Sequence, residues 1–370
     1  MPEGTPHEQK VPGDLAQIPI IWKYELLRYL RSKRLIASIA IAFLVIGLIY
    51  VLPPALGHPY SGSRTDSRLT VEGLGSVGLP SGSLPFGSVG LLNDTGVNAD
   101  TIVVSVNGTV VPKGTSWFIA GTHGTPTVNL PGSAVVLFFT DDLTESNVTA
   151  SYDWTTSAQD FEGTFLGFAS ILIIICATFF GADAIVGEYQ NRTGYLMFPN
   201  PMRRETLFFG KYAASMTAGI FVVALFYGSI IILSAITIGA VDDRLAASFA
   251  FATEYLVATM AIAYLISSVL KGTTGATVLT FFLFVMILPI VDSVSMFSGV
   301  KMSGSVTFAA GVIQYVTQSP YPVDSTQSVG AITIHAFYPD PAIAAITMLA
   351  YAVIAIVLSL LLFKRKQLAG

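Results

Sequence analysis

Six long apolar runs constrain this chain more than any other feature of its sequence. They lie at about 35–52, 163–185, 212–239, 246–270, 273–291 and 341–363. A helix needs about 20 apolar residues to cross the hydrocarbon core of a bilayer, where its backbone groups must bond within the segment. Only 11% of the residues are charged, whereas soluble globular proteins carry about 25%. We therefore predict an α-helical polytopic membrane protein with six transmembrane helices.

The basic residues predict how these helices are oriented. Alternate segments between the runs, including both ends of the chain, hold 14 of the 19 Lys and Arg residues, and the other segments hold 5. Cytoplasmic segments of membrane proteins carry the excess of Lys and Arg. We expect a multi-pass protein of the cell (cytoplasmic) membrane with both termini in the cytoplasm and residues 1–17 as a disordered tail.

The segment 57–160, between the first span (35–56) and the rest of the bundle (161–370), is predicted to lie outside. Residues 60–88 are rich in Gly, Ser and Pro, which is typical of a loop or linker. Asn107-Gly108 favours a hairpin turn. Short runs rich in Val, Ile, Thr and aromatic residues, which are typical of strands, lie at 101–108, 116–121, 127–130, 133–140 and 147–154. We predict an inserted extracellular all-β, sandwich-like domain.

Three N-x-Ser/Thr sequons fall in this outer segment, at Asn93, Asn107 and Asn147. The pattern is the acceptor for N-glycosylation, but it is short and arises often by chance. Three sequons in one external domain favour a glycoprotein. The alternative is that these asparagines are ordinary polar turn residues, and the sequence leaves both open.

A second outer segment, 292–340, contains an apolar piece at 306–316 that is too short to span. We predict an interfacial or re-entrant helix there, and a loop over 317–330, which reads "TQSPYPVDSTQSVG".

The stretch 187–211 separates the second and third runs and concentrates charge, glycine and proline. Its basic residues fit a cytoplasmic loop, but that does not explain an acid at a helix end followed by a turn and a proline. The sequence "DAIVGEYQNRTGYLMFPNPMRRETLFFGK" resembles the type 2 ABC transporter permeases, in which this segment forms a coupling helix that docks on a cytoplasmic ATPase subunit. Their turn is commonly Gly-Thr, where this chain has Thr193-Gly194. The resemblance implies coupling roles for Glu188, Arg192, Gly194, Pro199, Arg203 and Lys211.

A second resemblance lies before the first run, at 18–34. On a helix, apolar side chains fall on one face and basic ones on the other. The apolar set is Trp22, Leu26, Tyr29 and Leu30. The segment is similar to the amphipathic elbow helix of the same family, which lies along the inner membrane surface. The residues of interest in it are Trp22, Glu25, Arg28 and Arg31.

Ionisable residues within spans are costly and mark candidate sites. Glu254 lies in the fourth run and could face a substrate path or a dimer seam, or simply bond a nearby hydroxyl group. Asp183 lies near the inner end of the second run, and we expect it to interact with Arg192 or with the elbow helix.

The sequence contains no G-x-x-x-x-G-K-Ser/Thr loop for phosphate binding. We expect no catalytic residues, no directly bound cofactor and no metal site, since the four His are scattered and there is one Cys. The resemblance implies an exporter permease that works as a homodimer or heterodimer, with two copies of a partner ATPase that bind ATP and Mg. The spans suit a lipidic or other hydrophobic cargo, and nucleic acid is not expected. The alternative is a membrane-anchored adhesion or sensor protein whose β domain carries the function, although six spans exceed what an anchor needs.

Overall fold

The structure, a computed structural model, describes residues 14–74, 85–121, 134–190, 204–329 and 332–365. The chain divides into two compact units. The helical unit comprises Met1–Ile49, Glu162–Ile232 and Asp242–Gly370, and the β unit comprises Tyr50–Phe161 and Leu233–Val241. Among the described residues, six helices are long and apolar enough to cross a membrane. With the strands between the first and second spans, they confirm the predicted fold class.

The helices are bounded as follows. The first span is α2 (Lys33–Ala55), preceded by α1 (Asp14–Leu30), and the second is α3 (Ala158–Leu166) with α4 (Ala169–Phe180). The short α5 (Val186–Gln190) follows, then α7 (Arg204–Thr237) and α8 (Leu245–Val269). The fifth span combines α9 (Thr273–Phe282), the π-helix η1 (Leu283–Ile287) and α10 (Leu288–Ser298), and the sixth is α13 (Pro341–Arg365).

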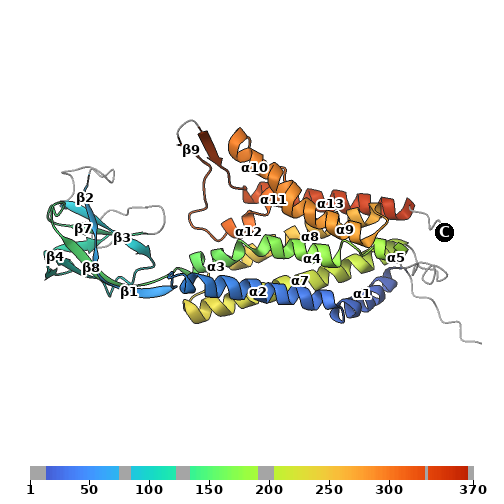
Figure 1. Ribbon diagram of the computed structural model, residues 1–370, viewed down its shortest axis with the longest axis horizontal. Coiled ribbons are helices and arrows are strands. Elements are labelled where there is room, and N and C mark those ends of the chain that lie inside the picture. Colours follow the sequence, from blue (N-terminus) through green and yellow to red (C-terminus); the bar gives the residue numbers. More distant parts are fainter. Residues whose placement is uncertain (1–13, 75–84, 122–133, 191–203, 330–331, 366–370) are drawn as a thin grey trace, which may run out of the picture. The chain divides into compact units, whose positions relative to one another are not determined.

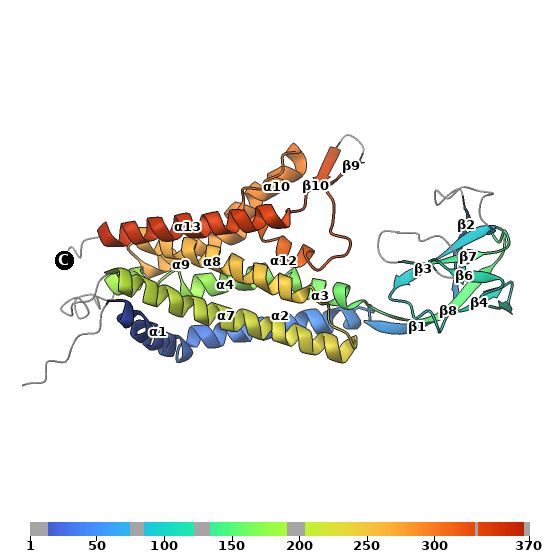
Figure 2. The ribbon, with the colours of Figure 1, turned by 180° about the vertical axis from the view of Figure 1, so that it is seen from behind.

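The helix α8 lies at the centre of the helical unit, with α13 and α4 packed along it (Figures 1 and 2). Its buried residues include Ala258, Ala261 and Ala263, all with 0% exposure. Small residues let helices approach closely in a membrane. At the end of α4, a Cβ on Gly181 would lie 2.7 Å from Met260 Sδ and 3.0 Å from Ala263 Cβ. Only glycine fits that crossing without a shift of the neighbouring atoms.

Two short helices and a hairpin occupy the end of the bundle opposite to α1 and α5 (Figure 1). The apolar piece at 306–316 forms α11 (Val306–Ala309) and α12 (Val312–Tyr315), with Val306 and Val312 fully buried. The predicted loop over 317–330 is wrong in part, because β9 (Ser325–Val329) pairs antiparallel with β10 (Ile332–Ala336). The Ser, Thr and Gln side chains of β9 are typical of loops, and the backbone pairing overrides them.

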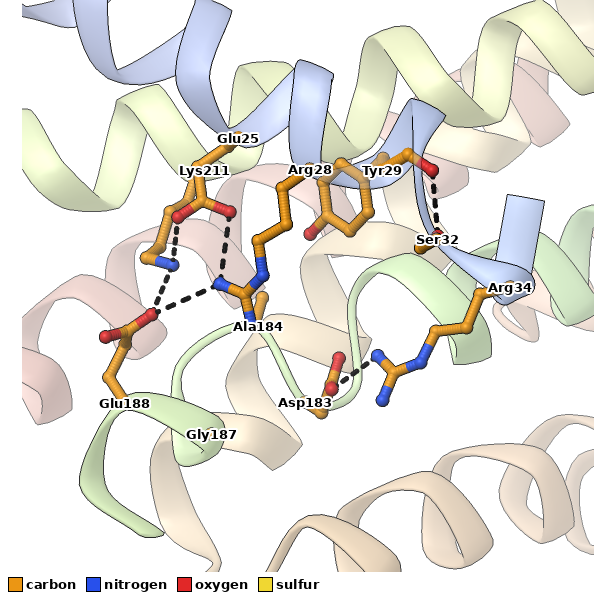
Figure 3. A pocket seen from close by; sticks show the side chains of 10 residues that line it. All are labelled: Glu25, Arg28, Tyr29, Ser32, Arg34, Asp183, Ala184, Gly187, Glu188 and Lys211. Atoms are coloured by element: carbon orange, nitrogen blue, oxygen red, sulfur yellow. Dashed lines mark hydrogen bonds and ion pairs between the residues drawn. The ribbon is translucent and has the colours of Figure 1, made fainter. Parts of the chain in front are cut away.

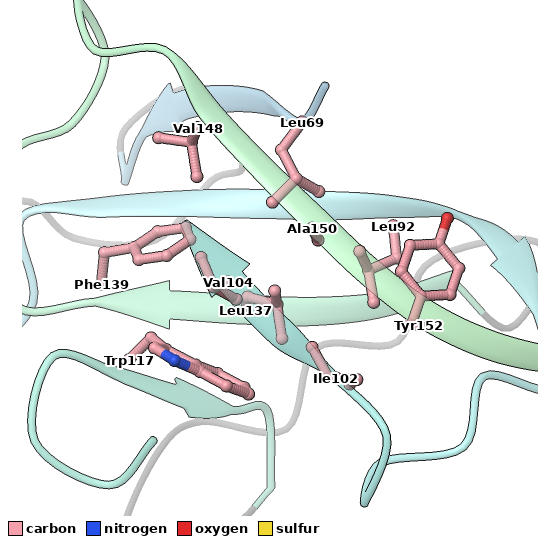
Figure 4. Packing of buried hydrophobic residues seen from close by; sticks show 10 residues of the cluster. All are labelled: Leu69, Leu92, Ile102, Val104, Trp117, Leu137, Phe139, Val148, Ala150 and Tyr152. Atoms are coloured by element: carbon pink, nitrogen blue, oxygen red, sulfur yellow. The ribbon is translucent and has the colours of Figure 1, made fainter. Parts of the chain in front are cut away.

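In its described residues, the β unit contains two four-stranded sheets, ordered β1-β8-β4-β5 and β2-β3-β7-β6. The first comprises β1 (Ser61–Arg68), β8 (Val148–Thr155), β4 (Val103–Val106) and β5 (Thr109–Val111). The second comprises β2 (Thr70–Gly73), β3 (Ser88–Thr95), β7 (Ala134–Phe139) and β6 (Trp117–Ile119). Residues of both sheets share one apolar core, which Figure 4 shows. This is the packing of a β-sandwich.

One prediction for this unit is wrong and another is confirmed. Residues 60–88 were expected to be loop, yet β1 and β2 lie within them. Pairing with β8 fixes β1 despite its Ser and Gly content, with a bulge between Arg64 and Ser67. The predicted turn joins β4 to β5, where Asn107 and Gly108 have φ of 51° and 83°. These values suit a type I′ turn. The predicted run at 127–130 lies outside the described residues.

Candidate functional site

The polar face of α1 holds this helix against the bundle. Trp22, Glu25 and Tyr29 are spaced three and four residues apart, so they share one side of the helix. The Trp22 indole N–H donates to Thr217 Oγ1 at 2.9 Å. The Tyr29 hydroxyl shares a 2.9 Å hydrogen bond with Ser215 Oγ. Since Thr217 and Ser215 both lie on α7, these bonds fix α1 along that helix.

The apolar residues of α1 are divided between two directions. Ile21 packs so closely on α7 that a Cβ on Gly210 would lie 2.6 Å from Ile21 Cγ2. Leu30, predicted to share a face with Tyr29, is instead 49% exposed, and Tyr24 and Leu27 are exposed as well. The polar face of α1 packs against the bundle because Lys211 forms an ion pair with Glu25 there and Ser215 forms a hydrogen bond with Tyr29. The outward apolar side chains are left to contact lipid.

Glu25, Arg28, Glu188 and Lys211 form an ion-pair network, which we call the Lys211 cluster (Figure 3). Lys211 Nζ lies 2.7 Å from Glu25 Oε1 and 2.7 Å from Glu188 Oε1. The Lys211 side chain is only 4% exposed. Arg28 Nη1 lies 3.5 Å from Glu25 Oε2 and 3.7 Å from Glu188 Oε1. The cluster therefore joins α1, α5 and α7 through four charged groups.

The charges of the cluster balance, two acids against two bases. A buried charge is tolerated only when it is paired and hydrogen-bonded. Burial opposes the charge of Arg28, but attraction by Glu25 and Glu188 outweighs it, and the pKa of the guanidinium is raised. Burial also raises the pKa of the Tyr29 phenol, so this hydroxyl stays protonated at neutral pH. At neutral pH the cluster therefore meets a charged guanidinium at Arg28 and a neutral hydroxyl at Tyr29.

A second ion pair lies beside the cluster, between Arg34 at the start of α2 and Asp183 in the turn after α4 (Figure 3). Arg34 Nη1 also donates to the Phe179 carbonyl oxygen at 3.3 Å. We expected Asp183 to meet either Arg192 or the segment 18–34. Its partner, Arg34, is the last residue of that segment, and Arg192 lies outside the described residues.

Hydroxyl groups extend the polar contacts from α1 into the bundle. Ser215 Oγ bonds both Tyr29 and the Tyr264 hydroxyl of α8, the latter at 2.7 Å. Ser267 Oγ, also on α8, accepts the N–H groups of Ile185 and Val186 at 3.1 and 3.0 Å. These bonds fix the backbone where α5 begins. The cluster is thus attached to α8 as well as to α7.

A cavity of about 230 Å³ lies among these groups, and we call it the α1 cavity. Figure 3 shows its lining, which comes from α1, the start of α2, the turn before α5, α5 and α7. The lining residues are Glu25, Arg28, Tyr29, Ser32, Arg34, Asp183, Ala184, Gly187, Glu188 and Lys211. Two parts of the chain singled out from sequence, the segment 18–34 and the stretch 187–211, therefore meet around one cavity.

The structure brings together some of the predicted site residues and leaves others apart. Glu188, Lys211, Glu25 and Arg28 meet in the cluster, whereas Arg31 is exposed at the end of α1. Arg192, Gly194, Pro199 and Arg203 lie outside the described residues. Glu254 is partly buried on α8, and no hydrogen bond or ion pair joins it to any residue that the structure describes.

Tyr29 was not predicted as a polar contact, and Arg34, Ser215, Tyr264 and Ser267 were not predicted as site residues. Tyr29 was counted as apolar, although its spacing from Trp22 and Glu25 could have placed it on the polar face. The serines stand within apolar runs, where hydropathy averages hide them.

Two of the three sequons lie side by side at one end of the β unit. The Asn147 N–H donates to Asn107 Oδ1 at 3.1 Å, and the Asn107 N–H donates to the Asn147 carbonyl at 2.9 Å. Both side chains are exposed. The side chain of Asn93 falls outside the description. Glycosylation of these residues stays a prediction.

A family model described as ABC-2 family transporter protein matches residues 19–368. The match extends from α1 through every element of the Lys211 cluster to the end of α13. No curated protein matches the chain. In the described part of the chain, no three His, Cys, Asp or Glu side chains are grouped so that they could hold a metal ion.

Proposed function

Because the chain belongs to the ABC-2 family of transporter proteins, a family of membrane permeases that work with an ABC ATPase, we propose that it is the membrane subunit of an ATP-driven exporter. The ATPase subunit docks at α5 and the segment that follows it. The family match supports this permease over an adhesion or sensor protein anchored by its helices. Six membrane helices with a buried ion network at one end suit a moving machine better than an anchor.

The observation that carries the proposal is the Lys211 cluster. Glu188 lies on α5, the element next to the proposed docking segment, and its carboxylate shares Lys211 Nζ with Glu25 of α1. Breaking one partner away from a buried ion pair is unfavourable by about 3–5 kcal/mol. A push on α5 therefore moves α1 and α7 with it rather than separating these elements. The cluster converts a local displacement into a movement of whole helices.

The remaining parts of the proposal concern the assembly. Two ATPase copies bind ATP and Mg, and two permeases, identical or different, form the path. The α1 end of the bundle faces the cytoplasm, which the distribution of 14 and 5 basic residues supports. The β unit is then extracellular. Arg192, Gly194, Pro199 and Arg203 complete the coupling surface with Glu188 and Lys211.

For the cargo we propose a lipidic or other hydrophobic compound. The spans expose many large apolar side chains, among them Phe43 of α2, Phe281 of α9 and Phe297 of α10, at 51%, 39% and 66%. Such surfaces suit both lipid and an apolar cargo. Glu254 is the polar group within the fourth span that a cargo or a second permease would meet, since charged groups in spans default to functional positions.

Affinity purification of the full chain from its own host in mild detergent tests the partner. We expect an ABC ATPase to copurify with the wild type and to be lost with Glu188→Lys, which places a third cation in the cluster beside Lys211 and Arg28. Glu205→Lys is the matched control, because Glu205 lies in the first turn of α7 with its side chain 49% exposed and pairs with Lys364. Size-exclusion profiles show that both variants are folded.

Two outcomes would contradict the proposal. The first is a wild-type protein that brings down no ATPase in any detergent or lipid. The second is an equal loss of the ATPase from Glu188→Lys and Glu205→Lys, because a general change of surface charge would then explain both results.

A further inference from the structure

The charges that line the α1 cavity are sorted by depth. The acids lie inside, with the side chains of Glu25, Glu188 and Asp183 exposed by only 9%, 11% and 16%. The two arginines lie at the surface, with Arg28 exposed by 62% and Arg34 by 50%. Although the lining is neutral in sum, the cavity presents a positive entrance to anything that approaches from outside.

The acids are already engaged, while the arginines keep hydrogen-bond donors. Lys211 lies between Glu25 and Glu188, and Arg34 holds Asp183. A guanidinium has five N–H donors on three nitrogens. Toward the described residues, Arg28 and Arg34 make their contacts through Nη1 alone. Both therefore have N–H groups left for an anion at the cavity entrance.

The position of the entrance identifies the kind of anion. Arg34 is the second residue of the spanning helix α2, which places it at the level of the lipid headgroups. Next to it, α1 exposes Tyr24 by 72% and Leu27 by 41%, and α2 exposes Ile36 by 63%. An apolar helix face beside basic side chains lies in the membrane interface. The anion within reach at that depth is the phosphate of a phospholipid.

We propose that the α1 cavity binds the phosphate group of a membrane phospholipid through Arg28 and Arg34. The planar fork of arginine matches phosphate oxygens in a bidentate manner. The acyl chains then lie along the exposed apolar residues of α1 and α2. Since Arg28 is also a member of the Lys211 cluster, the bound lipid ties α1 to α2 at the point where the cluster joins α1 to α5 and α7. The binding itself does not require the exporter function, because it involves the permease alone.

Native mass spectrometry of the purified full-length chain tests the proposal. The protein is titrated with dioleoyl phosphatidylglycerol and, separately, with dioleoylglycerol, which has the same chains and no phosphate. We expect saturable binding of the phospholipid only. Arg28→Gln and Arg34→Gln should each weaken it by about tenfold, as expected for loss of a charged hydrogen bond. The matched control is Arg31→Gln, an exposed arginine that does not line the cavity, and it should change the affinity by less than about twofold.

Several results would overturn the proposal. Equal weakening by Arg31→Gln would mean a diffuse surface attraction, and equal binding of dioleoylglycerol would mean that the phosphate is not recognised. Inorganic phosphate that binds alone as tightly as the lipid would mean an ion site and not a lipid site.

A further variant covers the case in which the glutamine variants do not fold. Arg28→Lys with Arg34→Lys keeps both charges and their ion pairs but removes the forks, so binding should weaken while the fold persists. Binding at wild-type strength would contradict recognition by the guanidinium forks. A loss of lipid binding with the ATPase still copurifying would separate this inference from the exporter function.

Discussion

The core of the β unit and the Lys211 cluster hold their elements together in opposite ways. In the β unit, Trp117, Leu137 and Phe139 are exposed by 1% or less and fill an apolar interior between two sheets. At the α1 end of the helical unit, the buried groups that meet include Glu25 and Lys211, which carry charge. The β unit is held by apolar contacts, whereas the α1 end of the helical unit is held by ion pairs.

The difference follows from the solvent of each unit. In water, burying apolar surface stabilises a fold by about 25 cal/mol for each Å². Between helices in a membrane this gain is absent, because lipid tails are as apolar as the side chains. Close packing and polar contacts must then decide which helices meet. A polar network at the membrane boundary can specify one position for α1, and it can also transmit force between the helices that it joins.

Removing the central cation should have the largest effect. Lys211→Met leaves Glu25 and Glu188 buried with Arg28 alone, so we expect the helical unit to lose about 3–5 kcal/mol of stability. Thermal unfolding of the full chain in detergent measures it. Lys364→Met is the control, since this lysine is 42% exposed and its pair should contribute about 1 kcal/mol at most. Similar losses from both variants would contradict the buried cluster.

In the β unit, a comparable loss should come from an apolar side chain. Trp117→Ala opens a cavity and leaves the Val111 carbonyl without the indole N–H, which donates to it at 3.1 Å. We expect the free energy of unfolding of the β unit to fall by about 3–5 kcal/mol. The protease susceptibility of the β unit within the full chain measures this loss. Val110→Ala is the control: Val110 lies on β5 of the other sheet and is 63% exposed, so the change should leave protease susceptibility unchanged. If Trp117→Ala were as resistant to protease as the wild type, this core would not be what holds the two sheets together.

A smaller effect is expected from one hydroxyl group at the boundary between α1 and the bundle. Tyr29→Phe removes the bonds to Ser215 and to the Phe180 carbonyl, and Ser215 can still donate to that carbonyl. The packing of α1 on the bundle should lose about 1 kcal/mol of stability, and hydrogen exchange in α1 should become faster. Tyr24→Phe, 72% exposed, is the control. An unchanged exchange rate in Tyr29→Phe would mean that the charged groups alone hold α1 against the bundle.

The weakest expected effect is the pH dependence of the β unit. The pKa of Asp94 is held below its ordinary value by hydrogen bonds from Arg64, at 3.0 and 3.2 Å, and from Tyr152 at 2.8 Å. Its contribution is therefore complete above the unfolded pKa of about 4 and is lost as the pH falls through the folded value. Protease susceptibility should rise below about pH 4 in the wild type and change less in Asp94→Asn. Identical pH profiles would exclude Asp94 as the group responsible.

The sequence predicts the helices well because the membrane makes simple demands on them. Twenty apolar residues suffice to identify a span, and the positions of α2, α7, α8 and α13 follow from that rule. Interruptions do not follow from it. The π-helix η1 in the fifth span arises from backbone bonding next to Pro289, which lacks an N–H group. A hydropathy average over a window of residues cannot predict such a change in backbone hydrogen bonding.

The cluster itself shows what one sequence cannot provide. Glu188 and Lys211 were selected through the resemblance to a coupling helix, and Glu25 and Arg28 through the resemblance to an elbow helix. Neither resemblance pairs the two sets of residues. Glu25 and Lys211 are 186 residues apart, and their contact depends on how α1 lies on α7. In the β unit, β1 was missed for the same reason, because its pairing with β8 determines its conformation more than its composition does.

The most direct test of the account is the ATPase rate of the purified complex in lipid, relative to the isolated ATPase subunit, for Glu188→Gln and Glu205→Gln. Glu188→Gln keeps the shape of the side chain and removes its charge from Lys211. We expect Glu188→Gln to lower the stimulation of the ATPase rate by about tenfold, as for loss of a charged hydrogen bond, and Glu205→Gln to leave it unchanged. Full stimulation with Glu188→Gln in a correctly assembled complex would contradict the claim that the Lys211 cluster couples the two subunits.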